Sequence, residues 1–306
     1  MTATGPALEA KVTRLVRLLE LTEVGPDRYL GPGGELDLPR IFGGQVLAQA
    51  LVAAGRTVEP AKAVHSLHAY FLRGGDPHDP VEYQVERVRD GRRLASRSVT
   101  AWQGGKRLAT MTASFAATAG GVEHQRAAPR TPPPDRVPTL AEASQAWGGL
   151  SGSWSDFAAW EIRVDPRRLN RPGSDPAQWT DHVWQRVPGP LAADGLLHQA
   201  LLVYASDFMQ LASALVPHGV PLGCEEVAGQ AWDGVSLDHS VWFHRPVRAD
   251  QWLLFEQHSP VAATGRAFTR AEVFTPEGVL VASVAQEGLI FDLGDLGSPT
   301  PSTPGA

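Results

Sequence analysis

Three polar side chains, Asp207, Ser236 and Gln286, have the chemistry needed to activate a water molecule. A carboxylate accepts a proton, while a hydroxyl and a carboxamide can each donate and accept hydrogen bonds. Together such groups can hold one water and aim it at a carbonyl carbon. Taken singly, Asp207 could be a helix cap and Ser236 a residue that opens a strand, so only the combination indicates a site.

The combination stands out because the chain contains the same kind of segment twice. In both copies a helix-like stretch leads to a His-Ser pair that opens a strand-rich run: IFGGQVLAQAL with HSLHAYFLR, then YASDFMQLASAL with HSVWFHR. Matching the two copies pairs Gly43 with Asp207, Lys62 with Ser236, and Ala113 with Gln286. The acid, the hydroxyl and the amide therefore occur only in the second copy, which predicts a duplicated fold with one equipped site.

The neighbouring elements are expected to position these groups. Asp207 lies at the expected start of a helix, where the positive end of the helix dipole favours an ionised carboxylate. Gln286 lies in an apolar final strand, where a buried amide needs partners for both of its polar atoms. Gly43 and Gly44 open another helix. Their amides could stabilise an oxyanion, or the two glycines could serve a tight turn or close packing.

Periodicity and turn signals outline each copy as one helix and an antiparallel sheet. The expected helices cover 7–21 and 43–56, with a third that begins near residue 206. The expected strands are 64–72, 81–89, 92–103, 106–116, 157–164, 181–187, 235–245, 251–261, 264–276 and 279–291. One such unit alone leaves apolar surface exposed, so the two halves should pair side by side. The predicted domains are 1–117 and 156–292, joined by a Pro/Gly/Ala-rich linker at 118–155 and followed by a disordered tail at 293–306.

Composition narrows the possible partners and location. The net charge of -6 over 306 residues offers no basic surplus for nucleic acid. A single cysteine, Cys224, excludes an internal disulfide and suits a reducing compartment. No uninterrupted apolar run approaches the length of a membrane span, so we expect a cytoplasmic protein without stable membrane association.

The histidines and glycines suggest no metal site and no cofactor. His65-x-x-His68 and the pair His239 and His244 lack a third ligand at metal-site spacing. His65 and His239 occupy equivalent positions in the two copies, which favours a structural role for both. The chain contains neither a Gly-rich phosphate loop nor the G-x-S-x-G motif of a serine nucleophile.

At these motifs the chain resembles the acyl-CoA thioesterase II family, whose members fuse two hotdog domains in one polypeptide. The resemblance runs from about Leu18 to Ile290. It is carried by FGGQVLAQAL, VHSLHAYFLRGGDP, VERVRDGRRLASRSV, MTASF, HQALLVYASDF, SLDHSVWFHRP and VLVASVAQEG.

The resemblance implies an α+β double hotdog, with two antiparallel sheets each wrapped around a central helix. It also implies hydrolysis of fatty acyl-CoA to free acid and CoA by an activated water, in fatty acid and lipid metabolism, by a homo-oligomer. The catalytic set carried over by motif is Asp207, Ser236 and Gln286, with Ser236 where the family more often has Thr. Surface arginines are candidates for contacts with the CoA phosphates, namely Arg89, Arg92 and Arg97.

Two other functions stay open at this point. One is a hotdog hydratase or dehydratase acting on acyl thioesters, although the chain lacks a His-x-x-x-Gly-x-x-x-x-Pro run. The other is a non-catalytic protein that binds acyl-CoA. Release of free thiol from acyl-CoA would distinguish the hydrolase from both.

Overall fold

The structure is a computed structural model of the whole chain, and it describes most of the residues. The described residues are 5–34, 36, 38–150, 157, 159–165, 180–218, 220, 222–223 and 232–292. The tail predicted at 293–306 lies outside them, as does Cys224.

The N-terminal half folds a six-stranded antiparallel sheet against one long helix. In chain order its elements are α1 (Pro6–Arg17), β1 (Thr22–Gly25), β2 (Arg28–Gly31), α2 (Gly43–Gly55), β3 (Lys62–Phe71), β4 (Val81–Asp90), β5 (Leu94–Gln103) and β6 (Lys106–Ala117). The strands lie in the order β1-β2-β4-β5-β6-β3. The hairpin of β1 and β2 was not expected from the sequence, because four residues are too few to show an alternating pattern.

The C-terminal half repeats the arrangement around a second helix. Its strands are β7 (Glu161–Val164), β8 (Asp181–Arg186), β9 (Trp232–Ser236), β10 (Asp238–Phe243), β11 (Leu253–Ala263), β12 (Arg266–Phe274) and β13 (Leu280–Asp292). Its helices are α3 (Leu140–Ser144) and α4 (Gly195–Ser206), with short 3-10 turns η1 (Pro134–Arg136), η2 (Gln145–Trp147), η5 (Leu211–Ala214) and η6 (Val216–His218). The strand order continues β10-β13-β12-β11-β8-β7, and β9 also pairs with β13.

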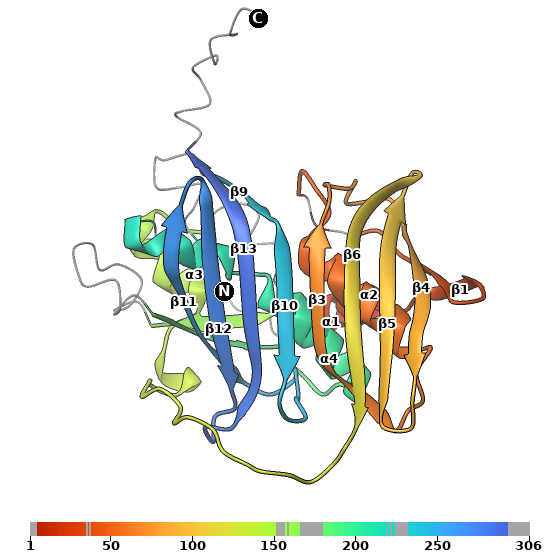
Figure 1. Cartoon of the computed structure of the whole chain (residues 1–306). Helices are drawn as coiled ribbons and strands as arrows, with labels where there is room; N and C mark the ends of the chain where they lie inside the picture. The colour runs from red at the N-terminus through yellow and green to blue at the C-terminus, as the bar shows by residue number, and fades with distance from the viewer. Residues whose placement is uncertain are drawn as a thin grey trace, which may run out of the picture.

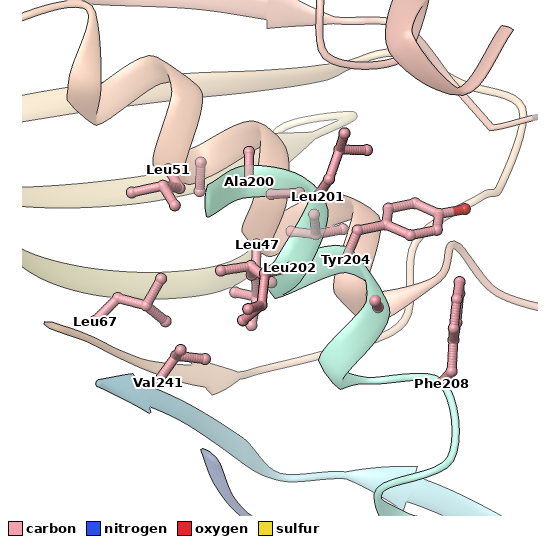
Figure 2. Packing of buried hydrophobic residues seen from close by; sticks show 14 of the residues in the cluster. Leu47, Leu51, Leu67, Ala200, Leu201, Leu202, Tyr204, Phe208 and Val241 are labelled. Atoms are coloured by element: carbon pink, nitrogen blue, oxygen red, sulfur yellow. The ribbon is translucent and has the colours of Figure 1, made fainter. Parts of the chain in front are cut away.

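The two halves share one sheet and one core. Strand β3 pairs antiparallel with β10, with Leu67 opposite Val241, so the sheet runs unbroken across the molecule (Figure 1). Helices α2 and α4 lie on the same face of this sheet. Figure 2 shows Leu47 of α2 beside Leu202 of α4, with Leu67 and Val241 of the paired strands β3 and β10 nearby. The expected side-by-side pairing of two sheet-and-helix units is therefore present.

The position of the second central helix differs from the expectation. Helix α4 ends at Ser206, where the sequence pattern had predicted a helix to begin, and Asp207 is its C-cap residue. The helix starts after Asp194, whose side chain accepts a hydrogen bond from the Leu196 amide at 2.9 Å. Its residues from His198 to Ser206 are all buried, so the helix shows no polar stripe that periodicity could detect.

The expected strand at 235–245 is two strands placed end to end. Strand β9 ends at Ser236 and β10 begins at Asp238, and both pair with β13. Between them, the Leu237 carbonyl accepts a hydrogen bond from the Phe71 amide at 2.9 Å. The interruption places Ser236 at the end of β9, opposite Gly288 of β13, the last strand in the chain.

The segment after β6 crosses to the other half and lies against it. The Gln125 side chain donates to the Gly278 carbonyl at 2.7 Å, and the Trp184 indole donates to the Pro132 carbonyl at 3.1 Å. Helix α3 opens with a capping box between Thr139 and Glu142. This described part of the linker therefore lies over the C-terminal half.

One stretch, Gly195–His218, has the length and mean hydropathy of a membrane span. Of its most apolar window, 78% is buried inside the protein, where it forms α4 and the turns that follow.

Candidate functional site

The three polar side chains singled out in the sequence converge in space. The Gln286 side-chain amide donates one hydrogen bond to Asp207 Oδ1 at 2.8 Å and another to Ser236 Oγ at 2.7 Å. The Ser236 hydroxyl also hydrogen-bonds to the Asp207 carboxylate. We call these three residues the trio. They come from the end of α4, the end of β9 and the middle of β13, which are far apart in sequence.

Burial controls the electrostatics of the trio. The Asp207 side chain is only 5% exposed and Gln286 is 1% exposed. Burial raises the pKa of Asp207 to about 6, against the opposing effect of hydrogen bonds from Gln286, the Gly44 amide and Ser236. The pKa of a general base works best close to the operating pH, so this carboxylate is suited to accept a proton near neutrality.

The Gly44 hydrogen bond shows that both halves build the site. Gly44 is in the first turn of α2, where backbone amides have no acceptor within the helix. Its amide donates to the Asp207 carboxylate, which comes from the C-terminal end of α4. The prediction that Asp207 heads its own helix was wrong. The helix N-terminus that favours its negative charge belongs to α2 in the other half.

This arrangement also changes the expected role of the two glycines. A Cβ on Gly44 would come within 2.6 Å of the Tyr204 carbonyl oxygen, and a Cβ on Gly43 within 2.8 Å of Asp207 Oδ2. The glycines therefore permit close approach between α2 and the end of α4. The Gly44 amide orients the acid in this structure, so the pair is not simply a free set of donors for an oxyanion.

The structure corrects the matching of the two copies. Helices α2 and α4 run antiparallel, because Gly44 lies against Tyr204 at one end and Gly55 against Leu196 at the other. Leu67 pairs with Ala113 in the first half, and Val241 pairs with Val284 in the second half. These two pairs occupy equivalent positions in the two sheets. The structural counterparts of the trio are accordingly Gly55 for Asp207, Lys62 for Ser236 and Phe115 for Gln286. Two of the three matched residues were wrong, yet the conclusion that only the second half carries the trio holds.

His65 and His239 are equivalent in sequence but face opposite sides of the sheet. A β-bulge between Val64 and Ser66 turns His65 to the outer face, where it bonds Ser114 Oγ at 2.8 Å. Strand β10 pairs with β3 and β13 without a register shift, and His239 points inward with no exposed surface. The two histidines therefore occupy equivalent sequence positions in different environments.

The arginines suggested for CoA phosphates differ in exposure. Arg97 has no exposed surface, and its guanidinium donates to Thr57 Oγ1 at 2.7 Å and to Asp90 Oδ1 at 2.6 Å. It also donates to the backbone carbonyls of Thr57, Arg89 and Ser96. A guanidinium that is buried and fully engaged cannot bind phosphate, so the suggestion was wrong for Arg97. Arg89, near the end of β4, and Arg92, in the turn between β4 and β5, are both exposed.

Within the described part of the chain, no three His, Cys, Asp or Glu side chains are grouped so that they could hold a metal ion. A cavity of about 790 Å³ lies on the outer face of the C-terminal sheet, the face opposite helix α4. Its lining includes Arg126, Trp242, Glu256 and Arg270, and it contains no member of the trio.

Comparison with known proteins identifies the family. The family model described as acyl-CoA thioesterase matches residues 153–289, and the model of an acyl-CoA thioesterase N-terminal domain matches residues 36–116. Human acyl-coenzyme A thioesterase 8 is 35% identical over 297 residues, which cover 93% of this chain and 91% of that protein.

Solved structures confirm the fold. The chain is similar to acyl-CoA thioesterase II TesB2 from Mycobacterium marinum, with 41% identity, a TM-score of 0.76, and coverage of 90% of this chain and 97% of that one. A hotdog protein of unknown function from Alicyclobacillus acidocaldarius, 19% identical, superposes with a TM-score of 0.71 over 97% of this chain and 100% of its own. With a double hotdog fold and matches to the family along both halves, the chain belongs to the acyl-CoA thioesterase family of thioester hydrolases.

Proposed function

We propose that the protein hydrolyses fatty acyl-CoA to a free fatty acid and CoA by direct attack of water, with the trio as its catalytic centre. The convergence of Asp207, Ser236 and Gln286 carries this proposal. Family membership supports the reaction. The Asp207 side chain is buried and its pKa is raised, which supports its role as base.

The chemical steps follow from the groups present. Asp207 takes a proton from water while the water oxygen bonds to the thioester carbonyl carbon. Ser236 holds that water in line, Gln286 fixes the carboxylate and the hydroxyl that contact it, and the Gly43 amide at the start of α2 stabilises the oxyanion that forms. The carbonyl then reforms as the C–S bond breaks. The departing CoA thiolate takes the proton from Asp207, which restores the carboxylate without an acyl-enzyme.

The substrate contacts outside the trio are also proposals. Arg89 and Arg92 are exposed, and their positive charge can pair with a phosphate. Both are therefore proposed contacts for the phosphates of CoA. Replacing both with Gln should raise KM for acyl-CoA and leave kcat nearly unchanged. A variant with wild-type KM would remove these two arginines from the binding site.

The decisive experiment is a thiol-release assay on purified protein, with acyl-CoAs from acetyl-CoA to palmitoyl-CoA. Wild type should release thiol, and Asp207→Asn should reduce kcat by roughly 10²–10⁴-fold, the range for loss of a general base. Asp207→Asn with wild-type turnover would refute the mechanism. A change in unsaturation without thiol would favour a hydratase, and tight binding without any reaction would favour a binding protein.

We also propose that the protein acts in fatty acid metabolism in the cytoplasm as a homo-oligomer. The single cysteine supports a reducing compartment. Light scattering coupled to size-exclusion chromatography tests the assembly, and cell fractionation tests the location. A monomer, or recovery of the protein with membranes, would contradict the corresponding part.

A further inference from the structure

His239 is enclosed between the trio and helix α4. Its imidazole has no exposed surface. On one side, its Nε2 lies 2.8 Å from Ser206 Oγ. On the other, its Nδ1 lies 3.9 Å from Asp207 Oδ1, which is too long for a hydrogen bond. The proposed reaction does not use this histidine, although it touches the residues that do.

The orientation of the Gln286 amide needs an explanation. Its NH2 group points at Asp207 and Ser236, which uses both of its hydrogens. Its Oε1 is buried and, among the described residues, has no hydrogen-bond partner. His239 Nδ1 is buried and without a partner in the same way. The two side chains meet at Asp207 Oδ1, which lies 2.8 Å from Gln286 Nε2 and 3.9 Å from His239 Nδ1. In agreement with this closeness, an interaction with Gln286 raises the pKa of His239 in opposition to burial.

Counting protons selects one arrangement of these groups. The Ser206 hydroxyl has one hydrogen and two neighbours, the Val203 carbonyl at 2.9 Å and His239 Nε2 at 2.8 Å. If it donates to Val203, Nε2 must carry the imidazole proton, and the Nδ1 lone pair then faces the Gln286 oxygen. Two buried acceptors facing each other without a proton are unfavourable.

The other arrangement gives both ring nitrogens and Gln286 Oε1 a partner, and the Val203 carbonyl gives up the hydroxyl hydrogen. The Ser206 hydroxyl donates to Nε2, so the neutral imidazole carries its proton on Nδ1, where Gln286 Oε1 can accept it. The Gln286 amide is then fixed with its NH2 group toward the carboxylate and the hydroxyl. A flipped amide would place its oxygen against the Asp207 carboxylate.

We propose that His239 is a positioning residue: held as the Nδ1–H tautomer by Ser206, it donates to Gln286 Oε1 and fixes the amide rotation on which the trio depends. This inference rests on the proposed function of the trio. The imidazole acts as a neutral donor and not as an acid or base. Burial supports this, because it lowers the pKa of His239 to about 4.

Two variants of similar polarity test the donor. The nitrogen of an Asn side chain can take the place of Nδ1, so His239→Asn should keep kcat within about tenfold of wild type. The longer Gln side chain reaches toward Ser206 and leaves the Nδ1 position without a donor. His239→Gln should therefore lose kcat on the order of 10–100-fold with little change in KM, since a small misplacement of a catalytic group has that effect. Thiol release from the acyl-CoA that the wild type hydrolyses fastest is the readout.

The control is His244, a histidine on the outer face that also bonds a serine, with Nε2 2.9 Å from Ser283 Oγ. His244→Gln should leave kcat unchanged. Each variant is assayed below its own thermal midpoint, which separates misfolding from misplacement.

If folded His239→Gln keeps wild-type kcat, or if the Asn and Gln variants fall equally, His239 does not act through Gln286. If the wild type itself releases no thiol from any acyl-CoA, the proposed function fails instead, and the two failures are distinct.

Discussion

Asp207 combines a buried position with three hydrogen-bond donors, and its pKa of about 6 reflects the stronger effect of burial. The proposed reaction needs the carboxylate form. We therefore expect kcat/KM to fall about tenfold per pH unit below about pH 6, and to be flat just above it. A pH profile of thiol release checks this. An acid limb centred near 4, the value of an exposed carboxylate, would show that Asp207 is not the group that titrates.

The same raised pKa makes a prediction about stability. The folded protein holds the Asp207 proton more tightly than the unfolded chain, so burying the carboxylate costs stability above about pH 6. That cost is relieved as the pH falls from about 6 toward 4. Asp207→Asn should thus be more stable than wild type at about pH 8, with a free energy of unfolding higher by roughly 3 kcal/mol at most. It should accordingly unfold at a higher temperature. The difference should vanish near pH 4, and thermal melts at both pH values measure it. A less stable variant at pH 8 would contradict the sign.

The helices α2 and α4 bring the acid to its donors. Close contact at the start of α2 requires glycine, because a Cβ on Gly43 would meet Asp207 Oδ2 at 2.8 Å. At the opposite end of α2, a Cβ on Gly55 would meet only the flexible tip of Leu196, also at under 3 Å. A side chain at position 43 would therefore displace a member of the trio, whereas one at position 55 would displace only Leu196.

Gly43→Ala should displace the carboxylate and lower kcat on the order of tenfold or more. Gly55→Ala is the matched control. It should cost some stability through crowding and change kcat little. Steady-state kinetics and thermal melts of both variants decide the point. Equal losses of kcat in the two would mean that disturbed helix packing, and not contact with Asp207, limits activity.

At the scale of the whole molecule, the two halves are joined by the β3–β10 ladder and by the packing of α2 on α4. A site that takes its acid from one half and an amide donor from the other needs this joint to stay closed. The fold thus gives the half without the trio a part in the proposed site, through the Gly44 amide.

Leu202 of α4 has no exposed surface and packs at this joint. Leu202→Ala should lower the free energy of unfolding by about 2–5 kcal/mol. Because the core is shared, activity and circular dichroism should be lost in one transition during denaturant titration. Two separate transitions, with activity lost in the first, would show that the halves unfold independently.

Residue types and motif order alone identified the trio, the family and most strands. Alternation and turn signals report local backbone preference, which is why β4 to β6 and β11 to β13 were predicted nearly in full. A helix buried on every side has no such signature, so α4 was missed and Asp207 was assigned to the wrong end of a helix.

Other features depended on long-range packing and could be known only from the tertiary structure. Sequence matching gave His65 and His239 the same position, but one β-bulge turned His65 outward and left His239 buried beside Gln286. Arg97 looked like a surface cation until the fold enclosed it. Local sequence therefore determined which groups were available. The antiparallel approach of α2 and α4 decided which of them meet, because burial and hydrogen-bond partners are set by segments distant in the chain.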